Sequence, residues 1–133
     1  MTSRGQVPDE WPEYSGIARE EWDNQADIWD NRMGDEGNDF HQELVRPSVD
    51  ELLSPVGGEA ILDVGCGNGI YARHLARLGV QVTATDVSPV MIDMARQRTR
   101  EGVGQITYKV IDATSEEEFP MCQYRVRHFC IRV

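Results

Sequence analysis

The sequence is poor in basic side chains, and lysine is almost absent from it. Its 133 residues include 23 Asp and Glu but only 13 Lys and Arg, which gives a formal net charge of −10 at pH 7. Lys109 is the only lysine. A protein that binds duplex nucleic acid or an anionic membrane surface needs a surplus of basic residues. The composition therefore argues against nucleic acid and against a membrane as partners.

Cysteine and long apolar segments are also scarce. The three cysteines, Cys66, Cys122 and Cys130, are odd in number and lack a CxxC pair, so neither a disulfide framework nor a metal site is predicted. Residues 1–10 lack the apolar stretch of a signal peptide. No apolar run approaches the length of about 20 residues that spans a bilayer. We therefore expect a cytoplasmic protein.

The residue pattern divides the chain, which is long enough for one domain at most, into four segments. In order they are a flexible arm, an N-terminal helical cap, a ligand-binding α/β half and an atypical basic tail: residues 1–16, 17–56, 57–122 and 123–133. The arm is inferred from Pro8 and Pro12. The tail alternates polar and apolar residues, which would suit a further strand.

The helical cap is predicted to contain two helices. The first carries apolar residues at steps of four, three and four, which is one face of an amphipathic helix: Trp22, Ala26, Trp29 and Met33. The glycine-containing segment 34–38 ends this helix. Asp39 is the expected cap of the second helix, and Pro47 is expected to kink that helix or to restart it in a first turn.

From Ala60 onward the pattern alternates between strands and helices. Short apolar or β-branched runs predict strands, and helical spacing between them predicts helices: strands at 60–64, 80–85 and 106–111, and helices at 70–78 and from 89 on. Ser88 and Pro89 are the expected N-cap and first residue of the last helix. This alternation predicts an α/β fold with a parallel sheet and right-handed crossovers.

The turn Gly65-Cys66-Gly67-Asn68-Gly69 connects the first predicted strand to the following helix. Glycines allow a positive φ and let a ligand lie against bare backbone. The helix that follows directs free N–H groups towards the turn. This pattern is typical of a ligand-binding loop, although a glycine cluster in this position can also be a plain tight turn.

Three carboxylates follow or end the three predicted strands. Asp63 precedes the glycine turn, Asp86 ends the second strand 23 residues later, and Asp112 ends the third. The carboxyl ends of parallel strands form the rim at which such sheets bind ligands, and an acid at the end of the second strand suits a ribose diol. Together with the glycine turn, the three acids predict a nucleoside-binding site.

Two nucleoside ligands compete for this site. Gly67, Gly69 and Ala72 fit the GxGxxA fingerprint of dinucleotide-binding folds, and Asp86 follows at about the expected 20 residues. An NAD-type oxidoreductase is therefore one alternative. However, Asp63 would repel a pyrophosphate at the helix N-terminus. S-adenosylmethionine (SAM) carries an ammonium and a sulfonium and no phosphate, and an acidic rim suits both cations.

Residues 62–69, 85–96 and 110–113 resemble, in order and spacing, three motifs of the class I SAM-dependent methyltransferases. Residues 22–47 are similar to the helical cap of small-molecule members near the ubiquinone and menaquinone methyltransferases. The resemblance covers roughly residues 20–120. It implies a Rossmann-like fold with an N-terminal helical cap, SAM as the cofactor and methyl transfer to a small-molecule acceptor.

The resemblance also implies residue roles. Ten positions match cofactor-binding positions of the family: Asp63, Gly65, Cys66, Gly67, Gly69, Asp86, Val87, Met91, Asp112 and Ala113. The glycines shape the loop under the methionine part of SAM, and Asp63 orders that part. Asp86 accepts from the ribose hydroxyls. Val87 and Met91 pack on the adenine.

Asp112 is implied to accept from the adenine amino group, and Ala113 to allow its close approach. The cap offers three aromatic candidates for closing the site: Tyr14, Trp22 and Trp29. His41 and His74 are interpreted as solvated or structural side chains, and no catalytic residue is predicted.

The C-terminal part departs from the family pattern. The family sheet normally has seven strands, whereas this chain stops near the fourth, where Tyr124 is followed by Arg125 instead of Asp. The segment from Gln123 on looks truncated or aberrant. A SAM- or nucleoside-binding module without catalysis is therefore a further alternative. An incomplete sheet would expose residues 61–64 as an edge strand, through which a homodimer is expected.

Overall fold

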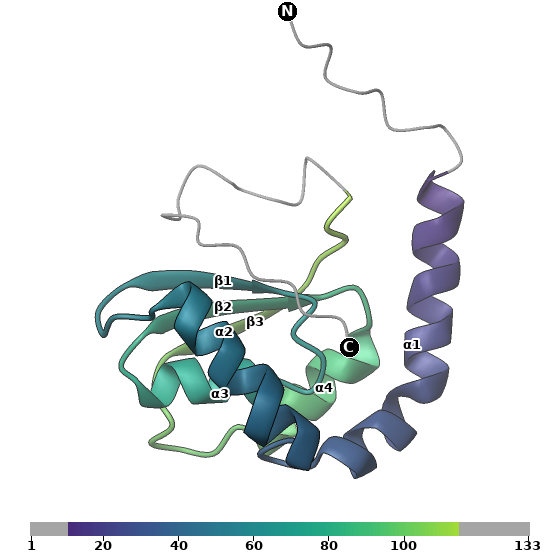
Figure 1. Ribbon diagram of the computed structural model, residues 1–133. Coiled ribbons are helices and arrows are strands. Elements are labelled where there is room, and N and C mark those ends of the chain that lie inside the picture. The colour runs from purple at the N-terminus through teal and green to yellow at the C-terminus, as the bar shows by residue number, and fades with distance from the viewer. Residues whose placement is uncertain (1–10, 115–133) are drawn as a thin grey trace, which may run out of the picture.

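The computed structural model describes residues 11–114, in which a parallel sheet is combined with helices (Figure 1). The sheet has three strands in the order β1-β2-β3: β1 Ala60–Val64, β2 Gln81–Asp86 and β3 Ile106–Val110. Both strand pairs are parallel. The predicted α/β class is thus confirmed, whereas the basic tail and its possible strand lie outside the described residues.

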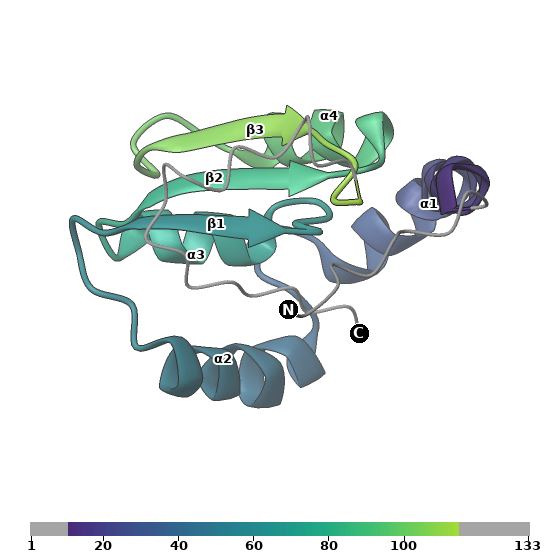
Figure 2. The ribbon, with the colours of Figure 1, turned by 90° about the horizontal axis from the view of Figure 1, so that it is seen from above.

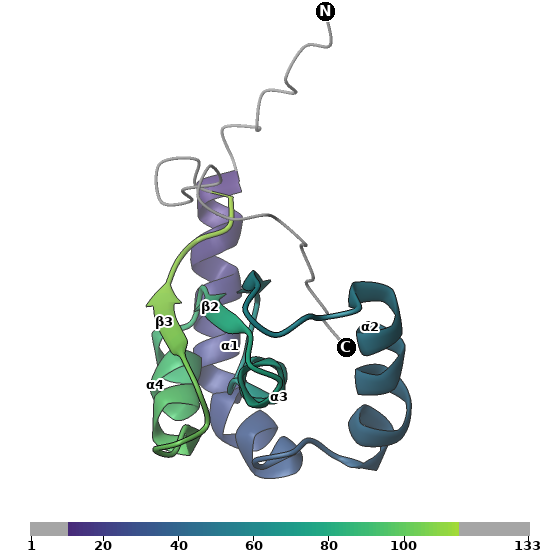
Figure 3. The same ribbon diagram turned by 90° about the vertical axis from the view of Figure 1, so that its left-hand side faces the viewer.

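Within residues 11–114, five helical segments accompany the sheet: α1 Trp11–Met33, the π-helix η1 His41–Val45, α2 Arg46–Leu53, α3 Ile70–Arg77 and α4 Pro89–Arg98. Seen along the strands, α3 and α4 lie against one face of the sheet (Figure 3). From above, α2 lies beyond β1, and α1 stands at the carboxyl ends of the strands (Figure 2). The cap therefore reaches the rim of the sheet where the predicted ligand residues lie.

The core lies between the sheet and α3, with one contribution from α2. Its buried members are small or branched apolar side chains: Leu53, Ile61, Ala72, Leu75, Ala76, Val80, Val82 and Ala84. Leu75 is buried in this core, whereas Leu78, directly after α3, is 46% exposed. Gly79, with a φ of +84°, follows the end of the helix.

The start of α4 follows the prediction from its local sequence. The Ser88 side chain accepts a hydrogen bond from the backbone N–H of Met91 at 3.1 Å, and Pro89 takes the first helical position. Ser88 also donates to the Asp23 carboxylate on α1. The N-cap therefore joins the first helix of the cap to the carboxyl end of β2.

Two predicted features of the cap are wrong. Residues 11–16, assigned to a flexible arm, are the first turns of α1; Pro12 fits there because the first turn of a helix needs no N–H from it. The helix after the break is capped by Asn38 rather than by Asp39, since the Asn38 carboxamide oxygen accepts from the His41 backbone N–H at 2.9 Å.

Pro47 restarts the second cap helix, as predicted. It lies in the first turn of α2, and the preceding turn is the π-helix η1. Proline lacks the N–H for an α-helical bond to the residue four positions earlier, and its ring crowds that carbonyl. A π-turn relieves this conflict by widening the helix locally.

None of the helices within residues 11–114 has the length and apolar character needed to cross a bilayer. The cytoplasmic location expected from the sequence stays a prediction.

Candidate functional site

A cavity of about 280 Å³ lies where the glycine loop faces the cap. The cap contributes Trp29, Phe40 and His41 to its lining, the glycine loop contributes Cys66 and Gly67, and the end of β1 contributes Asp63. Trp22 packs edge-to-face on Trp29, with 6.0 Å between ring centroids. Of the three aromatic candidates for closing the site, Trp29 lines the cavity, whereas Tyr14 is 60% exposed on α1.

The glycine loop adopts the left-handed backbone that its composition predicts. Gly65, Gly67 and Gly69 have φ values of +74°, +56° and +83°. At Gly67 a Cβ atom would lie 3.6 Å from Nε1 of Trp29. At Gly69 it would lie 2.7 Å from the Tyr108 hydroxyl, so this glycine lets the loop pack against β3.

The N–H groups of the loop bond within the protein. Gly65 and Cys66 both donate to the Thr85 carbonyl, at 2.8 and 2.9 Å. Gly67 donates to Oδ2 of Asp86 at 3.0 Å. A loop that binds a pyrophosphate directs such N–H groups at the ligand. In this loop the N–H groups already donate to protein acceptors, so a ligand beside the loop would meet mainly hydrogen-bond acceptors.

Asp63 is the most perturbed carboxyl group of the site. Its side chain is buried, with the residue only 7% exposed, and its Oδ2 has no hydrogen-bond partner among residues 11–114. Burial, with a further contribution from the charge of Asp86, raises the pKa of Asp63 to about 7. A buried carboxylate without a partner is costly, and a cationic ligand in the cavity would relieve that cost.

Asp86 holds the loop in place and lies close enough to Asp63 to raise its pKa. One carboxylate oxygen accepts from Gly67 and the other from the Ser88 N–H, each at 3.0 Å. A carboxylate offers about four acceptor positions. Asp86 therefore keeps acceptor capacity for a ligand after both backbone bonds are made.

Of the remaining predicted cofactor residues, Val87, Asp112 and Ala113 follow the ends of β2 and β3, and Met91 lies in α4. Like Asp86 and Gly69, they lie outside the lining of this cavity. The Asp112 carboxylate accepts from the Thr114 N–H at 2.9 Å, and Ala113 beside it is exposed. The Met91 side chain is 1% exposed, and Val87 is half-buried.

Helix α1 contacts the same strand ends. Arg19 donates to the Val87 carbonyl at 3.2 Å, and the hydroxyls of Ser15 and Thr114 are 3.2 Å apart. The first helix of the cap thus covers the end of the site at which the adenine of a nucleoside was predicted to lie.

Cys66 lies in the glycine loop, and its surroundings make its thiol unreactive. Burial, together with the nearby charges of Asp63 and Asp86, raises the pKa of the Cys66 thiol. The nucleophilic form of cysteine is the thiolate. Cys66 is therefore a neutral lining residue of the cavity.

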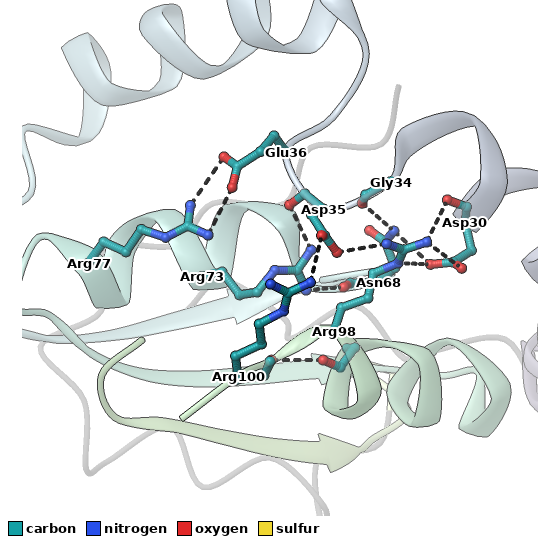
Figure 4. A network of polar contacts seen from close by, with 11 residues as sticks. Asp30, Gly34, Asp35, Glu36, Asn68, Arg73, Arg77, Arg98 and Arg100 are labelled. Atoms are coloured by element: carbon teal, nitrogen blue, oxygen red, sulfur yellow. Dashed lines mark hydrogen bonds and ion pairs between the residues drawn. The ribbon is translucent and has the colours of Figure 1, made fainter. Parts of the chain in front are cut away.

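The sequence reasoning missed the polar network that joins the cap to the loop (Figure 4). Asn68, only 1% exposed, donates to the Asp30 carboxylate at 2.9 Å and to the Gly34 carbonyl at 3.1 Å. Arg98, at the end of α4, binds both oxygens of Asp30, at 2.6 and 2.9 Å, and reaches Asp35 at 2.7 Å. These hydrogen bonds from Arg98 hold the pKa values of both aspartates below their ordinary values.

Arg73 completes this network, which we call the cap clamp: Asp30, Asp35, Asn68, Arg73 and Arg98. The guanidinium of Arg73 is buried and donates to the backbone carbonyls of Asn68 and Asp35. The only sequence signal for the clamp was the run of acids after residue 29, because its arginines lie 38 and 63 residues away from Asp35.

His74 has the structural role expected from the sequence. Its Nε2 and Oδ2 of Asp50 are 2.7 Å apart, and Tyr71 donates to the other oxygen of Asp50 at 2.8 Å. This group fixes α2 beside α3. His41, interpreted from the sequence as a solvated or structural side chain, is one of the residues that line the cavity.

The structure and the sequence together define a Rossmann-like methyltransferase domain. Residues 61–130, more than half of the chain, match the family described as methyltransferase domain, and the chain belongs to this family. The match extends into the segment from Gln123 on, which was singled out above as departing from the family pattern.

Curated relatives match part of the chain. Ubiquinone biosynthesis O-methyltransferase from Xanthomonas axonopodis pv. citri (strain 306) is 44% identical over 62 residues, which cover 47% of this chain and 26% of the relative. The protein of the same name from Xanthomonas campestris pv. campestris (strain B100) is 45% identical over 53 residues, 40% of this chain and 22% of the relative. The chain thus matches about a quarter of the length of these relatives.

Solved structures extend the likeness to the cap. Magnesium protoporphyrin IX methyltransferase (ChlM) from Synechocystis PCC 6803 with bound SAM superimposes with a TM-score of 0.58 at 27% identity, over 74% of this chain and 54% of that one. The cyclase SpnF gives a TM-score of 0.61 at 26% identity, over 76% and 44%. A neighbour that is named a cyclase shows that this fold alone does not fix the reaction.

The cap clamp makes a stability prediction. Arg98→Met keeps the length and apolar stem of the side chain but leaves Asp30, 16% exposed, without its ion pair. We expect the free energy of unfolding in urea to fall by about 2–3 kcal/mol, less than for a fully buried pair because water reaches both groups. The control is Arg96→Met, whose pair with Asp93 is exposed and should cost about 0.5 kcal/mol or less. Equal losses in the two variants would contradict the role of the clamp.

The raised pKa of Asp63 makes a prediction about pH. The unfolded carboxyl ionises near 3.8 and the folded one at about 7, so the folded state holds the extra proton between these values. Its contribution to stability is full below the unfolded pKa and is lost as the pH rises through 7. Urea unfolding should therefore show Asp63→Asn gaining stability relative to the unsubstituted protein as the pH rises from about 4 to about 7, by up to about 1.4 kcal/mol per pH unit, with the difference levelling off above pH 7. A difference independent of pH would exclude the raised pKa, and exposed Asp93→Asn is the control.

Proposed function

We propose that this chain binds SAM between the glycine loop and the cap and transfers its methyl group to a small-molecule acceptor. The observation that carries the proposal is Oδ2 of the buried Asp63 on the cavity wall, which has no hydrogen-bond partner among residues 11–114. A ligand with an ammonium group at this position would supply the missing hydrogen bond and charge. The amino group of the methionine part of SAM has this chemistry.

The other residues present also fit SAM. The Gly67 backbone and the free acceptor positions of Asp86 suit a ribose with two hydroxyls, and Asp112 on the neighbouring strand suits the amino group of adenine. Val87 and Ala113 would then border the adenine, and Met91 would support it from the core. When bound, SAM supplies a methyl group already activated by a sulfonium. The task left to the protein is to position the acceptor in line with it.

The dinucleotide alternative has less support. The N–H groups of Gly65, Cys66 and Gly67 already bond to the protein, and the carboxylates of Asp63 and Asp86 lie near one another beside them. A pyrophosphate would meet negative charge and find few donors in this loop. These contacts favour a cationic ligand over NAD.

The acceptor is proposed to be small because the cavity is small and is partly closed by the cap. Trp29, Phe40 and Tyr71 supply aromatic walls next to the loop. The names of the relatives and of ChlM describe methyl transfer in the biosynthesis of small molecules, which agrees with this size. We propose the same class of acceptor for this chain.

The binding part of the proposal is checked by calorimetric titration with SAM, S-adenosylhomocysteine and NAD. We expect binding of the first two and none of NAD. Asp86→Ala should weaken SAM binding by about 1–3 kcal/mol, because it removes a charged hydrogen-bond acceptor. Asp93→Ala, on the exposed side of α4, is the matched control and should bind as the unsubstituted chain does. An unchanged affinity in Asp86→Ala would reject its assignment to the ribose, and NAD binding alone would reject the proposed function.

Turnover separates a methyltransferase from a binding module without catalysis. Incubation with SAM and a panel of small acceptors should yield S-adenosylhomocysteine together with a methylated product. SAM binding without any product would favour the binding module.

We also propose that two copies associate beside β1. Among the described strands, β1 pairs only with β2, and exposed apolar side chains lie on the neighbouring cap helices, such as Leu52 at 76% and Leu44 at 54% exposed. Unpaired strand edges and apolar patches promote association. Size-exclusion chromatography with light scattering should detect a dimer at micromolar concentration, and Leu52→Glu should reduce it. A monomer at all concentrations would contradict association.

A further inference from the structure

Two residues that each carry a buried polar side-chain atom without a hydrogen-bond partner line the same cavity. Among residues 11–114, such unpartnered atoms occur on three side chains, and two of these, Asp63 and His41, border the cavity. Natural proteins leave few buried polar atoms unpaired, and each one calls for an explanation. The proposed function explains Asp63, whereas His41 plays no part in it so far.

The local sequence holds the His41 imidazole in a defined position. Asn38 caps the helix by accepting from the His41 N–H, and Gln42 donates to the Gly37 carbonyl at 2.7 Å. A Cβ atom at Gly37 would lie 2.7 Å from Nδ1 of His41, so the ring packs directly on this glycine. The conformation of Gly37, with a φ of +87°, also favours glycine. The loop before the helix is therefore built around the ring.

The imidazole is available for proton transfer. Within the described residues its ring makes no hydrogen bond, in contrast to His74, which is bonded to Asp50. Burial, with smaller contributions from the positive charges of Arg46 and His74, lowers the pKa of His41. A neutral histidine with a free lone pair is the form that accepts a proton near neutral pH.

The surroundings of His41 indicate the kind of molecule that would lie against it. Apolar side chains of the cap, including Phe40, Trp29 and Met33, line the cavity together with the ring. Ligand sites of this type bind an apolar body and orient it through a few polar groups. An apolar acceptor with one hydroxyl group would pack on these walls and direct its hydroxyl to the imidazole.

We propose that His41 is a catalytic residue that contacts the acceptor and takes the proton of its hydroxyl group during methyl transfer. This inference rests on the proposed function. The acceptor oxygen forms the new bond to the methyl carbon, and the carbon–sulfur bond breaks with its electron pair going to sulfur. The hydroxyl proton moves to His41, which later releases it to water. The acceptor is thereby a neutral hydroxyl compound at the start and a methyl ether at the end.

Other titratable groups also face this cavity. Asp63, Cys66 and Tyr71 line it, and Arg46 and His74 act on the imidazole through their charges. Asp63 titrates at about 7 and would affect SAM binding over the same pH range. Rates at varying pH would mix these groups, so the test of His41 uses a direct spectroscopic signal from the bound acceptor.

The probe is 4-nitrophenol, a small planar hydroxyl compound whose visible absorbance rises when its proton is lost. It is titrated into the full chain in the presence of saturating S-adenosylhomocysteine. We expect the probe to bind and to show increased ionisation relative to the free compound at the same pH. His41→Asn and His41→Gln, which place an amide near the Nδ1 and Nε2 positions, should bind the probe on the order of tenfold more weakly, a change equivalent to about 1.4 kcal/mol. Both should also lose the increase in ionisation.

Two controls make the outcome specific. Asp93→Asn, on the exposed side of α4, should leave probe binding and ionisation unchanged. Gly37→Ala keeps the imidazole but displaces it, and should reduce ionisation while circular dichroism shows a folded chain. Affinity for S-adenosylhomocysteine, measured by calorimetry, should stay within about twofold in both His41 variants, because the inferred role lies on the acceptor side.

The outcomes separate this inference from the proposed function. If the unsubstituted chain fails to bind S-adenosylhomocysteine, the proposed function itself is wrong. If it binds this ligand but not 4-nitrophenol, or if the His41 variants bind and ionise the probe as the unsubstituted chain does, the role of His41 is overturned. Loss of ionisation in the His41 variants with retained S-adenosylhomocysteine binding supports it.

Discussion

The ion pair between Asp30 and Arg98 joins the two halves of this chain. Asp30 lies near the end of α1 and Arg98 at the end of α4, and Asn68 of the glycine loop donates to the same carboxylate. One side chain therefore sets the position of the cap relative to both the loop and the second crossover helix (Figure 4). The cavity exists only because the cap is held there, since cap residues form much of its wall. Partly buried ion pairs of this kind specify an arrangement more than they add stability.

The same arrangement accounts for the electrostatics of the site. The cap shields the loop from water, and this burial raises the pKa of Asp63 more than the neighbouring Asp86 does. The N–H groups of Gly65 and Cys66 already donate to the protein, whereas Oδ2 of Asp63 has no partner within residues 11–114. A positive charge at the cavity wall would therefore be stabilised there. A site of this character is prepared for a cation before any ligand arrives, and this is the physical basis on which SAM is favoured over a dinucleotide.

Much of the α/β half could be predicted because its signals are local. The glycine turn, the strand Ala60–Val64 and the Ser88 cap each depend on residues within a few positions of one another. The cap was harder to predict. Its clamp joins Asp30 to residues 38 and 68 positions away, and no local pattern encodes such pairs. The start of α1 was missed because Pro12 is compatible with both a loop and a first helical turn.

The candidate site likewise combines residues that could be predicted from the sequence with residues that could not. The acids at the strand ends were identifiable because parallel strands place their carboxyl ends on one rim. The position of His41 beside the cavity depends on how the cap folds back over the loop, and neither its own sequence context nor its spacing from Asp63 contains that information.

The π-turn at His41–Val45 sets the orientation of the cavity wall. His41 and Val45 line the cavity, and Val49 and Leu53, at the same spacing of four, are buried below. In a uniform α-helix each residue turns by about 100°, so a stripe at this spacing drifts around the helix axis. The wider π-turn offsets part of that drift between His41 and Val45. The number of residues in this turn therefore determines which side chains of the cap face the cavity. The loss or gain of one residue here would direct a different set of side chains to the cavity without changing the glycine loop.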